Sequence, residues 1–182
     1  HCAFSPMSST TVATLAKEFV MMGGGLYANQ GAIDPGAIDA RREFNWWFDA
    51  EATRIVLRAP WKKVTITPID ISVKTHFTKE IQATISKANT PITQYLDKYS
   101  LPGYMWDEIA GAALIDPSII TVQKRLYMDI DIDHGASYGK TLFWDASAHV
   151  PPYLRLANVQ FDLDTAKFYK LYVELMTRPP RQ

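Results

Sequence analysis

Residues 19–25 read FVMMGGG, so four apolar side chains end abruptly at three glycines. A short buried strand that ends in glycines is typical of α/β proteins, in which loops at the carboxyl ends of strands form sites. The following stretch, 26–42, contains Gly31, Pro35 and Gly36 and is predicted to form a long surface loop. Loops of this length in compact domains are usually functional or mobile. We therefore expect an α/β fold with a polar site near this strand end.

Strand patterns alternate with helix patterns along the rest of the chain. Asp49 has the position of an N-cap for the helix that follows it. The order of elements favours one α/β domain over residues 1–182, with a mostly parallel sheet flanked by helices and an antiparallel pair near 126–144. The predicted strands cover 64–69, 126–132, 140–144 and 158–163, and the predicted helices cover 8–17, 50–57, 77–88, 91–99, 107–114 and 165–176.

The composition excludes several classes of protein. The 182 residues are 47% hydrophobic and 21% charged, which is typical of a soluble globular chain and not of a disordered one. Nineteen basic residues balance nineteen acidic ones, so no net charge favours nucleic acid or an anionic membrane as a partner. The longest apolar run, 109–115, is far shorter than the roughly 20 residues that span a bilayer. Cys2 is the one cysteine and cannot form an internal disulfide. The sequence is compatible with either a cytoplasmic or a secreted location.

Glu43 and Asn45 directly follow the predicted loop. On an extended segment alternate residues face the same side, so a carboxylate and an amide would be presented together. Such a pair suits hydrogen bonding to sugar hydroxyls. The alternative, which the residues alone favour, is a solvated strand edge followed by the buried aromatic residues Trp46, Trp47 and Phe48.

Trp106 and Asp107 stand at the start of the predicted helix 107–114. An aspartate in this position is most often a cap that accepts free backbone N–H groups, and the residues alone favour this interpretation. The functional alternative is a carboxylate metal ligand beside an indole that presents its face to a planar ligand.

A second acidic group consists of Asp129, Asp131 and Asp133, next to His134. Three carboxylates on one strand face could bind calcium, but the EF-hand pattern is absent. We interpret them as the solvent-facing side of a strand. The four histidines of the chain show no zinc-binding spacing.

Taken in order, several short motifs resemble the inosine/uridine-preferring nucleoside hydrolase family. The motifs are MGGG at 22–25, EFN at 43–45 followed by FDAEA at 48–52, ITPID at 66–70, WDEIA at 106–110 and IDP at 115–117. The resemblance extends over almost all residues and matches the C-terminal half to two-thirds of the family. It implies a nucleoside hydrolase-like α/β fold without the family's first strands.

The resemblance also implies chemistry, because family members cleave the N-glycosidic bond of ribonucleosides with a tightly held calcium ion. By this resemblance Asp107 is a calcium ligand, Glu43 and Asn45 hold ribose hydroxyls, and Asn29 is a further ribose-binding candidate. Trp106 resembles the purine-preferring members, in which an indole stacks on the base and favours its protonation. Family relatives are homodimers or homotetramers, so self-association is expected.

One departure from the family concerns its Asp-x-Asp-x-Gly-x-Asp-Asp cluster, which has no counterpart in this sequence. The cluster supplies the catalytic base and most calcium ligands, and Asp107 alone cannot hold an ion that takes ~6–8 oxygens. We expect the 182 residues to be part of a longer protein, to pair with a complementary N-terminal segment, or to have lost hydrolysis. The leading hypothesis is a calcium-dependent purine nucleoside hydrolase, and the alternative is a non-catalytic nucleoside hydrolase-like binding or interaction protein.

Overall fold

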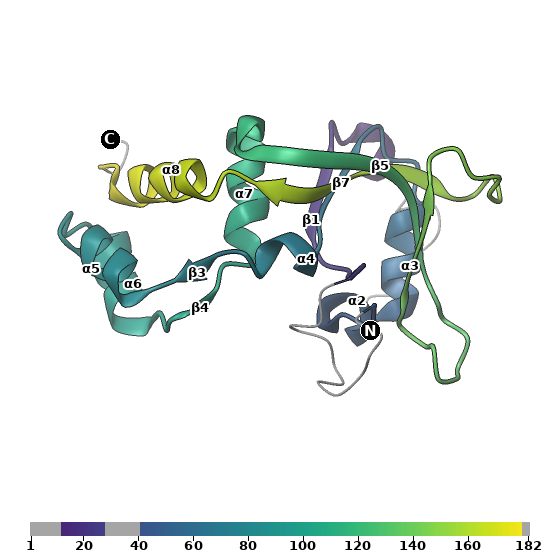
Figure 1. Ribbon diagram of the computed structural model, residues 1–182, viewed down its shortest axis with the longest axis horizontal. Coiled ribbons are helices and arrows are strands. Elements are labelled where there is room, and N and C mark those ends of the chain that lie inside the picture. Colours follow the sequence, from purple (N-terminus) through teal and green to yellow (C-terminus); the bar gives the residue numbers. More distant parts are fainter. Residues whose placement is uncertain (1–11, 28–40, 180–182) are drawn as a thin grey trace.

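The computed structural model describes residues 12–27 and 41–179 as a mixed five-stranded sheet flanked by helices (Figure 1). Helix α3 covers one face of the sheet and α7 the other, while α5, α6 and α8 gather at one end of the elongated molecule. The strands are β1 Phe19–Met22, β2 Val64–Thr67, β3 His76–Phe77, β4 Gly103–Tyr104, β5 Ile120–Ile130, β6 Thr141–Asp145 and β7 Arg155–Leu163. The helices are α2 Phe44–Phe48, α3 Ala50–Arg58, α4 Ile69–Ser72, α5 Lys79–Ser86, α6 Pro91–Tyr99, α7 Asp107–Ile115, the 3-10 helix η1 Pro117–Ile119 and α8 Thr165–Thr177.

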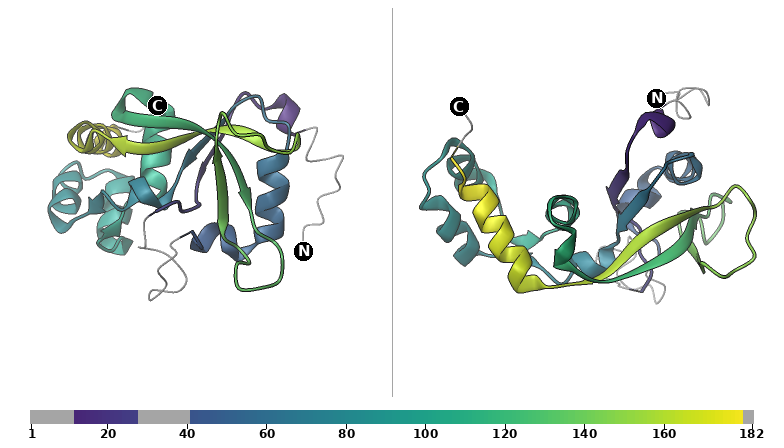
Figure 2. Two further views of the ribbon diagram at one scale, coloured as in Figure 1. Left: turned by 45° about the vertical axis from the view of Figure 1, so that its right-hand side comes forward. Right: turned by 90° about the horizontal axis from the view of Figure 1, so that it is seen from above.

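The main sheet has the strand order β1-β2-β7-β5-β6. Strands β1, β2 and β7 pair in parallel, whereas β5 pairs antiparallel with both β7 and β6 (Figure 2). The α/β class and the antiparallel pair near 126–144 are thus confirmed, and parallel pairing is confined to β1, β2 and β7. The first half of β5 was not predicted, because residues 121–125 are all exposed and carry no alternating pattern.

Local sequence features explain where two helices begin and where one predicted strand ends. The Asp49 carboxylate accepts the Ala52 N–H at 2.9 Å, which confirms the predicted N-cap of α3. A reciprocal capping box between Thr90 and Thr93 starts α6 at the predicted residue. The predicted strand 64–69 ends early, at Thr67, because Pro68 has no N–H to donate and instead precedes α4.

Two groups of buried apolar side chains hold the molecule together. The sheet cluster joins α2 and α3 to one face of β2, β5 and β7, and includes Trp46, Ile66 and Val159. The helical cluster joins α4, α5, α7 and α8, and includes Ile85 and Phe168. Side chains alternate between the faces of a strand, so the residues next to these on β2 and β7 face α7.

Candidate functional site

A cavity of about 330 Å³ lies where β1 and β2 end, between α2 and the start of α7. Its position agrees with the rule that ligands bind at the carboxyl ends of parallel strands, and its volume suits a small organic molecule. Four of the five predicted site residues contribute to this one cavity from two segments about 60 residues apart in the sequence. Its lining consists of Met22, Glu43, Phe44, Asn45, Ile69, Trp106 and Asp107.

Glu43 is a buried N-cap of α2 and not part of an extended segment, so the predicted geometry of the Glu43–Asn45 pair is wrong. One carboxylate oxygen accepts the Asn45 N–H at 2.9 Å, and the other accepts the N–H groups of Trp46 at 3.2 Å and Gly24 at 2.9 Å. Only 2% of Glu43 is exposed. The helix forms here because this carboxylate satisfies its first free N–H groups.

Asn45 stands in the first turn of α2 and is exposed to the cavity. Its side-chain amide donates to the sulfur of Met22, the last residue of β1, at 3.2 Å. The alternative of three buried aromatic residues is also incorrect, because only Trp46 is buried, whereas Phe48 is exposed.

The glycines after β1 are required by close packing against Trp46. Gly23 and Gly24 have φ angles of 146° and 78°, which residues with a side chain rarely adopt. A Cβ on Gly23 would lie 2.5 Å from the indole Nε1 of Trp46, and one on Gly24 would lie 3.0 Å from its ring carbons. The chain therefore passes flat over the indole and brings the end of β1 next to α2.

Trp106 occupies the N-cap of α7 without capping it through its side chain, and Asp107 is the first helical residue. The interpretation of Asp107 as a cap is therefore wrong. Among the described residues no hydrogen-bond or ion-pair partner is found for its carboxylate, which is exposed and lines the cavity. The positive end of the helix dipole favours a negative charge at this position.

The indole of Trp106 is held by neighbouring rings. It lies 4.9 Å from Tyr104, centroid to centroid, and Tyr104 lies 4.1 Å from the imidazole of His76. Both contacts are tilted, at 52° and 47°. The arrangement leaves part of the indole surface in the cavity, where it can contact a planar ligand.

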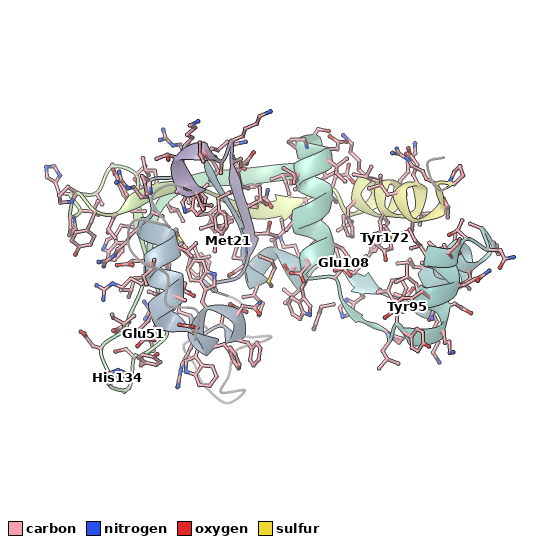
Figure 3. The ribbon with its side chains drawn as sticks, turned by 180° about the vertical axis from the view of Figure 1, so that it is seen from behind. Met21, Glu51, Tyr95, Glu108, His134 and Tyr172 are labelled. Carbon is pink, nitrogen blue, oxygen red and sulfur yellow. The ribbon has the colours of Figure 1, made fainter. Side chains whose placement is uncertain are left out.

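Asp129, from the second acidic group, lies away from the cavity. It is buried and forms an ion pair with Arg58 at 2.5 Å, so it does not face solvent as expected. Asp131 accepts the backbone N–H of Asp133, and His134 approaches Glu51 of α3 to 3.9 Å (Figure 3). Within residues 12–27 and 41–179 no group of three or more His, Cys, Asp or Glu side chains is placed to hold a metal ion.

Sequence reasoning missed the role of Asp70, although it belongs to the ITPID motif. Its carboxylate accepts the backbone N–H groups of Leu26 and Tyr27, at the exit of the glycine turn. Because these partners lie more than 40 residues away, no local pattern indicates the contact. The further candidate Asn29 lies outside the described residues.

Comparison with models of protein families gives one match. A family model described as inosine-uridine preferring nucleoside hydrolase matches residues 7–170. No curated protein sequence matches the chain. No helix in the described part of the chain has both the length and the apolar character needed to cross a membrane.

Solved structures show the same fold at low sequence identity. A plant nucleoside hydrolase superposes with a TM-score of 0.76 at 20% identity, over 96% of this chain and 58% of that one. The inosine-uridine preferring nucleoside hydrolase of Bacillus anthracis gives 0.70 at 17% identity, over 94% and 55%. The purine-preferring ribonucleoside hydrolase of Gardnerella vaginalis gives 0.68 at 20% identity, over 88% and 52%. The chain therefore spans little more than half the length of the structures it matches.

Proposed function

The chain belongs to the inosine-uridine preferring nucleoside hydrolase family, and we propose that its cavity binds a purine nucleoside for hydrolysis of the N-glycosidic bond. The observation that carries the proposal is the convergence of Glu43, Asn45, Trp106 and Asp107 on one cavity. These side chains offer hydrogen-bond acceptors and donors for a sugar, a ring surface for a base and a carboxylate for a cation.

Glu43 and Asn45 would hold the ribose. A carboxylate has about four lone-pair positions, and three of those on Glu43 already accept backbone N–H groups. The remaining position can accept one ribose hydroxyl, and the fixed carboxylate would orient that hydroxyl firmly. The Asn45 amide adds a donor and an acceptor at the cavity surface. Firm orientation of the sugar matters because positive charge develops on it as the bond to the base breaks.

Trp106 would stack on the base, which is the basis for the proposed purine preference. A purine offers a larger ring surface than a pyrimidine, so an indole face favours it. Stacking on an electron-rich ring also favours protonation of the purine, which makes the base a better leaving group.

The described residues do not form a calcium site by themselves. Asp107 supplies one carboxylate, Glu43 is engaged with backbone N–H groups, and Ca²⁺ takes ~6–8 oxygen ligands. We propose Asp107 as one ligand of a calcium ion whose other ligands come from outside the described residues.

The proposal also includes self-association as a dimer or tetramer, which light scattering would measure.

The proposal is tested by the replacement Trp106→Ala in the purified protein. Aromatic stacking contributes about 0.5–1.5 kcal/mol, so kcat/KM for inosine should fall by up to about tenfold from lost stacking, and further if leaving-group activation is lost. The melting temperature should change little, because Trp106 is partly exposed and its ring contact is with Tyr104. Wild-type turnover in this variant would rule out the role of Trp106.

Nucleoside binding without hydrolysis is the second candidate function. The cavity lining favours it. Among the described lining residues, Asp107 is the one carboxylate without a described partner, and no second free carboxylate is placed there to activate water. The same purified protein separates the two functions. Hydrolysis predicts base release from inosine and a rise in melting temperature on adding calcium. Binding alone predicts a rise in melting temperature with inosine and no base release.

A further inference from the structure

The short ribbon of β3 and β4 carries a row of three aromatic rings that ends at the cavity. The ribbon lies between α4 and the helices α5 and α6 (Figure 1). His76 and Tyr104 stand directly opposite each other in its antiparallel register, and their ring centroids lie 4.1 Å apart. Tyr104 in turn contacts Trp106, at 4.9 Å between ring centroids. Of these three residues, only Trp106 lines the cavity.

The main chain of the ribbon is held on both of its strands. A two-stranded pair is marginal by itself, so contacts with other elements are needed to keep it in place. The Tyr169 hydroxyl of α8 accepts the His76 N–H at 2.8 Å and donates to the His76 carbonyl at 3.1 Å. The Met105 N–H donates to Thr75 O at 3.3 Å, and the Met105 side chain is fully buried in the helical cluster. The main chain of β4 and of the residue after it is therefore tied to the helical cluster.

The indole of Trp106 has fewer contacts than the main chain that carries it. Trp106 is half-buried, and within the described part of the chain no hydrogen bond of its indole N–H is found. Tyr104 makes a ring contact with it, in a tilted arrangement of 52°. A side chain that nothing holds moves between staggered rotamers within picoseconds to nanoseconds. The orientation of the indole in the cavity therefore depends on its contact with Tyr104.

We propose that Tyr104 is a positioning residue, which holds the Trp106 indole in the orientation that stacks on a purine base; this rests on the proposed function. Stacking requires the plane of the indole to match that of the base, so an indole that is free to rotate stacks for only part of the time. The free energy of one aromatic pair corresponds to a factor of about 2–10 in the population of the productive orientation. Tyr104 thus acts on substrate through Trp106 without touching it.

The first test measures the mobility of the indole itself and needs no enzymatic activity. Nitrogen-15 relaxation gives the order parameter of the Trp106 indole N–H, whose signal is identified by its loss in Trp106→Phe. We expect a value near that of a rigid group, ~0.85, in the wild type and in Tyr104→Phe, which keeps the ring. In Tyr104→Leu, which keeps an apolar side chain without the ring, the order parameter should fall below ~0.6.

The matched control for this test is Tyr95→Leu. Tyr95 forms a tilted pair with Tyr99 on α6, at 4.7 Å and 45°, and neither residue lines the cavity. The control should leave the Trp106 indole rigid. An indole that is equally rigid in Tyr104→Leu, or already mobile in the wild type, would overturn the proposal. The wild-type measurement decides the second point even if Tyr104→Leu fails to fold.

The second test is a double-mutant cycle with Trp106→Ala, measured as kcat/KM for inosine. If Tyr104 acts through Trp106, Tyr104→Leu lowers kcat/KM by about 2–10-fold in the wild-type background and has no effect where Trp106 is already replaced. Tyr104→Phe should restore the wild-type value. Equal losses in both backgrounds would show that Tyr104 does not act through Trp106 and would overturn the proposal.

Failure of the proposed function is distinguishable from failure of this inference. If the wild-type protein binds inosine without cleaving it, the affinity for inosine replaces kcat/KM in the cycle, with the same expected pattern. If it neither cleaves nor binds inosine, the proposed function fails, while the order parameter of the indole still decides whether Tyr104 holds Trp106.

Discussion

At the scale of single residues, the candidate site depends on side chains that shape the backbone as much as on those that would touch a ligand. Glu43 satisfies three N–H groups, and one of its donors, Gly24, lies 19 residues away. Glutamate is not among the residues that usually cap helices, so its role here could not be predicted from local sequence. The ordered series of motifs, through its resemblance to the family, predicted that Glu43 and Asn45 belong to one site. The spacing of the two residues alone predicted a strand, which is not what forms.

The need for glycine at position 23 leads to the first prediction. Gly23→Ala places a Cβ 2.5 Å from Trp46 Nε1 at a φ of 146°, so both the clash and the backbone strain destabilise the folded state. We expect a loss of about 1–3 kcal/mol or more in the free energy of unfolding, measured by urea denaturation.

Gly111→Ala is the matched control for this prediction. Gly111 lies inside α7, and a Cβ there meets no atom within 4 Å. Alanine is the better helix former, so the free energy of unfolding should rise by about 0.5–1 kcal/mol. Equal effects at both positions would show that the contact with Trp46 does not constrain the turn.

At the scale of elements, the sequence predicts a boundary correctly where neighbouring residues set it. It fails where contacts with residues far along the chain set the boundary. Helix α6 begins at the predicted residue because Thr90 and Thr93 form a local capping box with Pro91 at the first helical position, and its last residue, Tyr99, also agrees with the prediction. The long strand β5 was predicted only from residue 126, because its first half is held by pairing with β7 and not by an alternating pattern. Likewise, β3 takes Phe77, the first residue of the predicted helix 77–88, since Phe77 pairs with Gly103 of β4, 26 residues further along the chain.

The packing of α8 against α7 gives a prediction about alkaline pH. Burial, together with the nearby Glu108 carboxylate, raises the pKa of Tyr172 from its ordinary value of 10.0 to about 12 (Figure 3). An unfolded tyrosine loses its proton near pH 10, whereas the folded protein retains it, so this contribution to stability is complete below pH 10 and is lost as the pH rises towards 12. At about pH 11 the loss should be about 1.4 kcal/mol.

Tyr172→Phe removes this contribution while keeping the ring in the helical cluster. We expect the free energy of unfolding of the wild-type protein to fall by about 1.4 kcal/mol more than that of the variant between pH 8 and about pH 11. Denaturation with urea at both pH values measures the difference. As a control, Tyr95→Phe removes a phenol from an exposed ring of α6 and should follow the wild type. A constant gap between the wild type and Tyr172→Phe at the two pH values would contradict the assignment.

At the scale of the whole molecule, the candidate site lies at the junction of the two buried clusters. Trp46 in the sheet cluster supports the glycine turn, while Ile109 of α7 anchors the helix that begins with Asp107 in the helical cluster. The two clusters are joined by β7, which contributes Val159 to one and Leu163 to the other. The geometry of the cavity therefore requires both clusters to be folded at the same time.

This junction predicts that the two ends of the molecule unfold in one transition. Four of the five tryptophans, at positions 46, 47, 61 and 144, lie on the elements and connections around the sheet, so tryptophan fluorescence reports mainly on that end. Far-UV circular dichroism reports largely on α5, α6, α7 and α8. Because β7 is continuous through both clusters, the melting curves from the two signals should coincide.

A conservative replacement in the helical cluster, which includes no tryptophan among its described residues, makes this prediction sharper. Ile85 on α5 is fully buried in the helical cluster, and Ile85→Val typically costs about 0.5–1.5 kcal/mol. For a chain of this size that corresponds to a fall of about 2–4 °C in melting temperature. If the clusters are coupled, the fluorescence transition moves by the same amount as the circular dichroism transition, although the helical cluster includes no tryptophan among its described residues. A fluorescence transition that stays at the wild-type temperature would mean that the helical end melts alone, and that the half of the cavity carrying Trp106 and Asp107 can come apart from the half carrying Glu43 and Asn45.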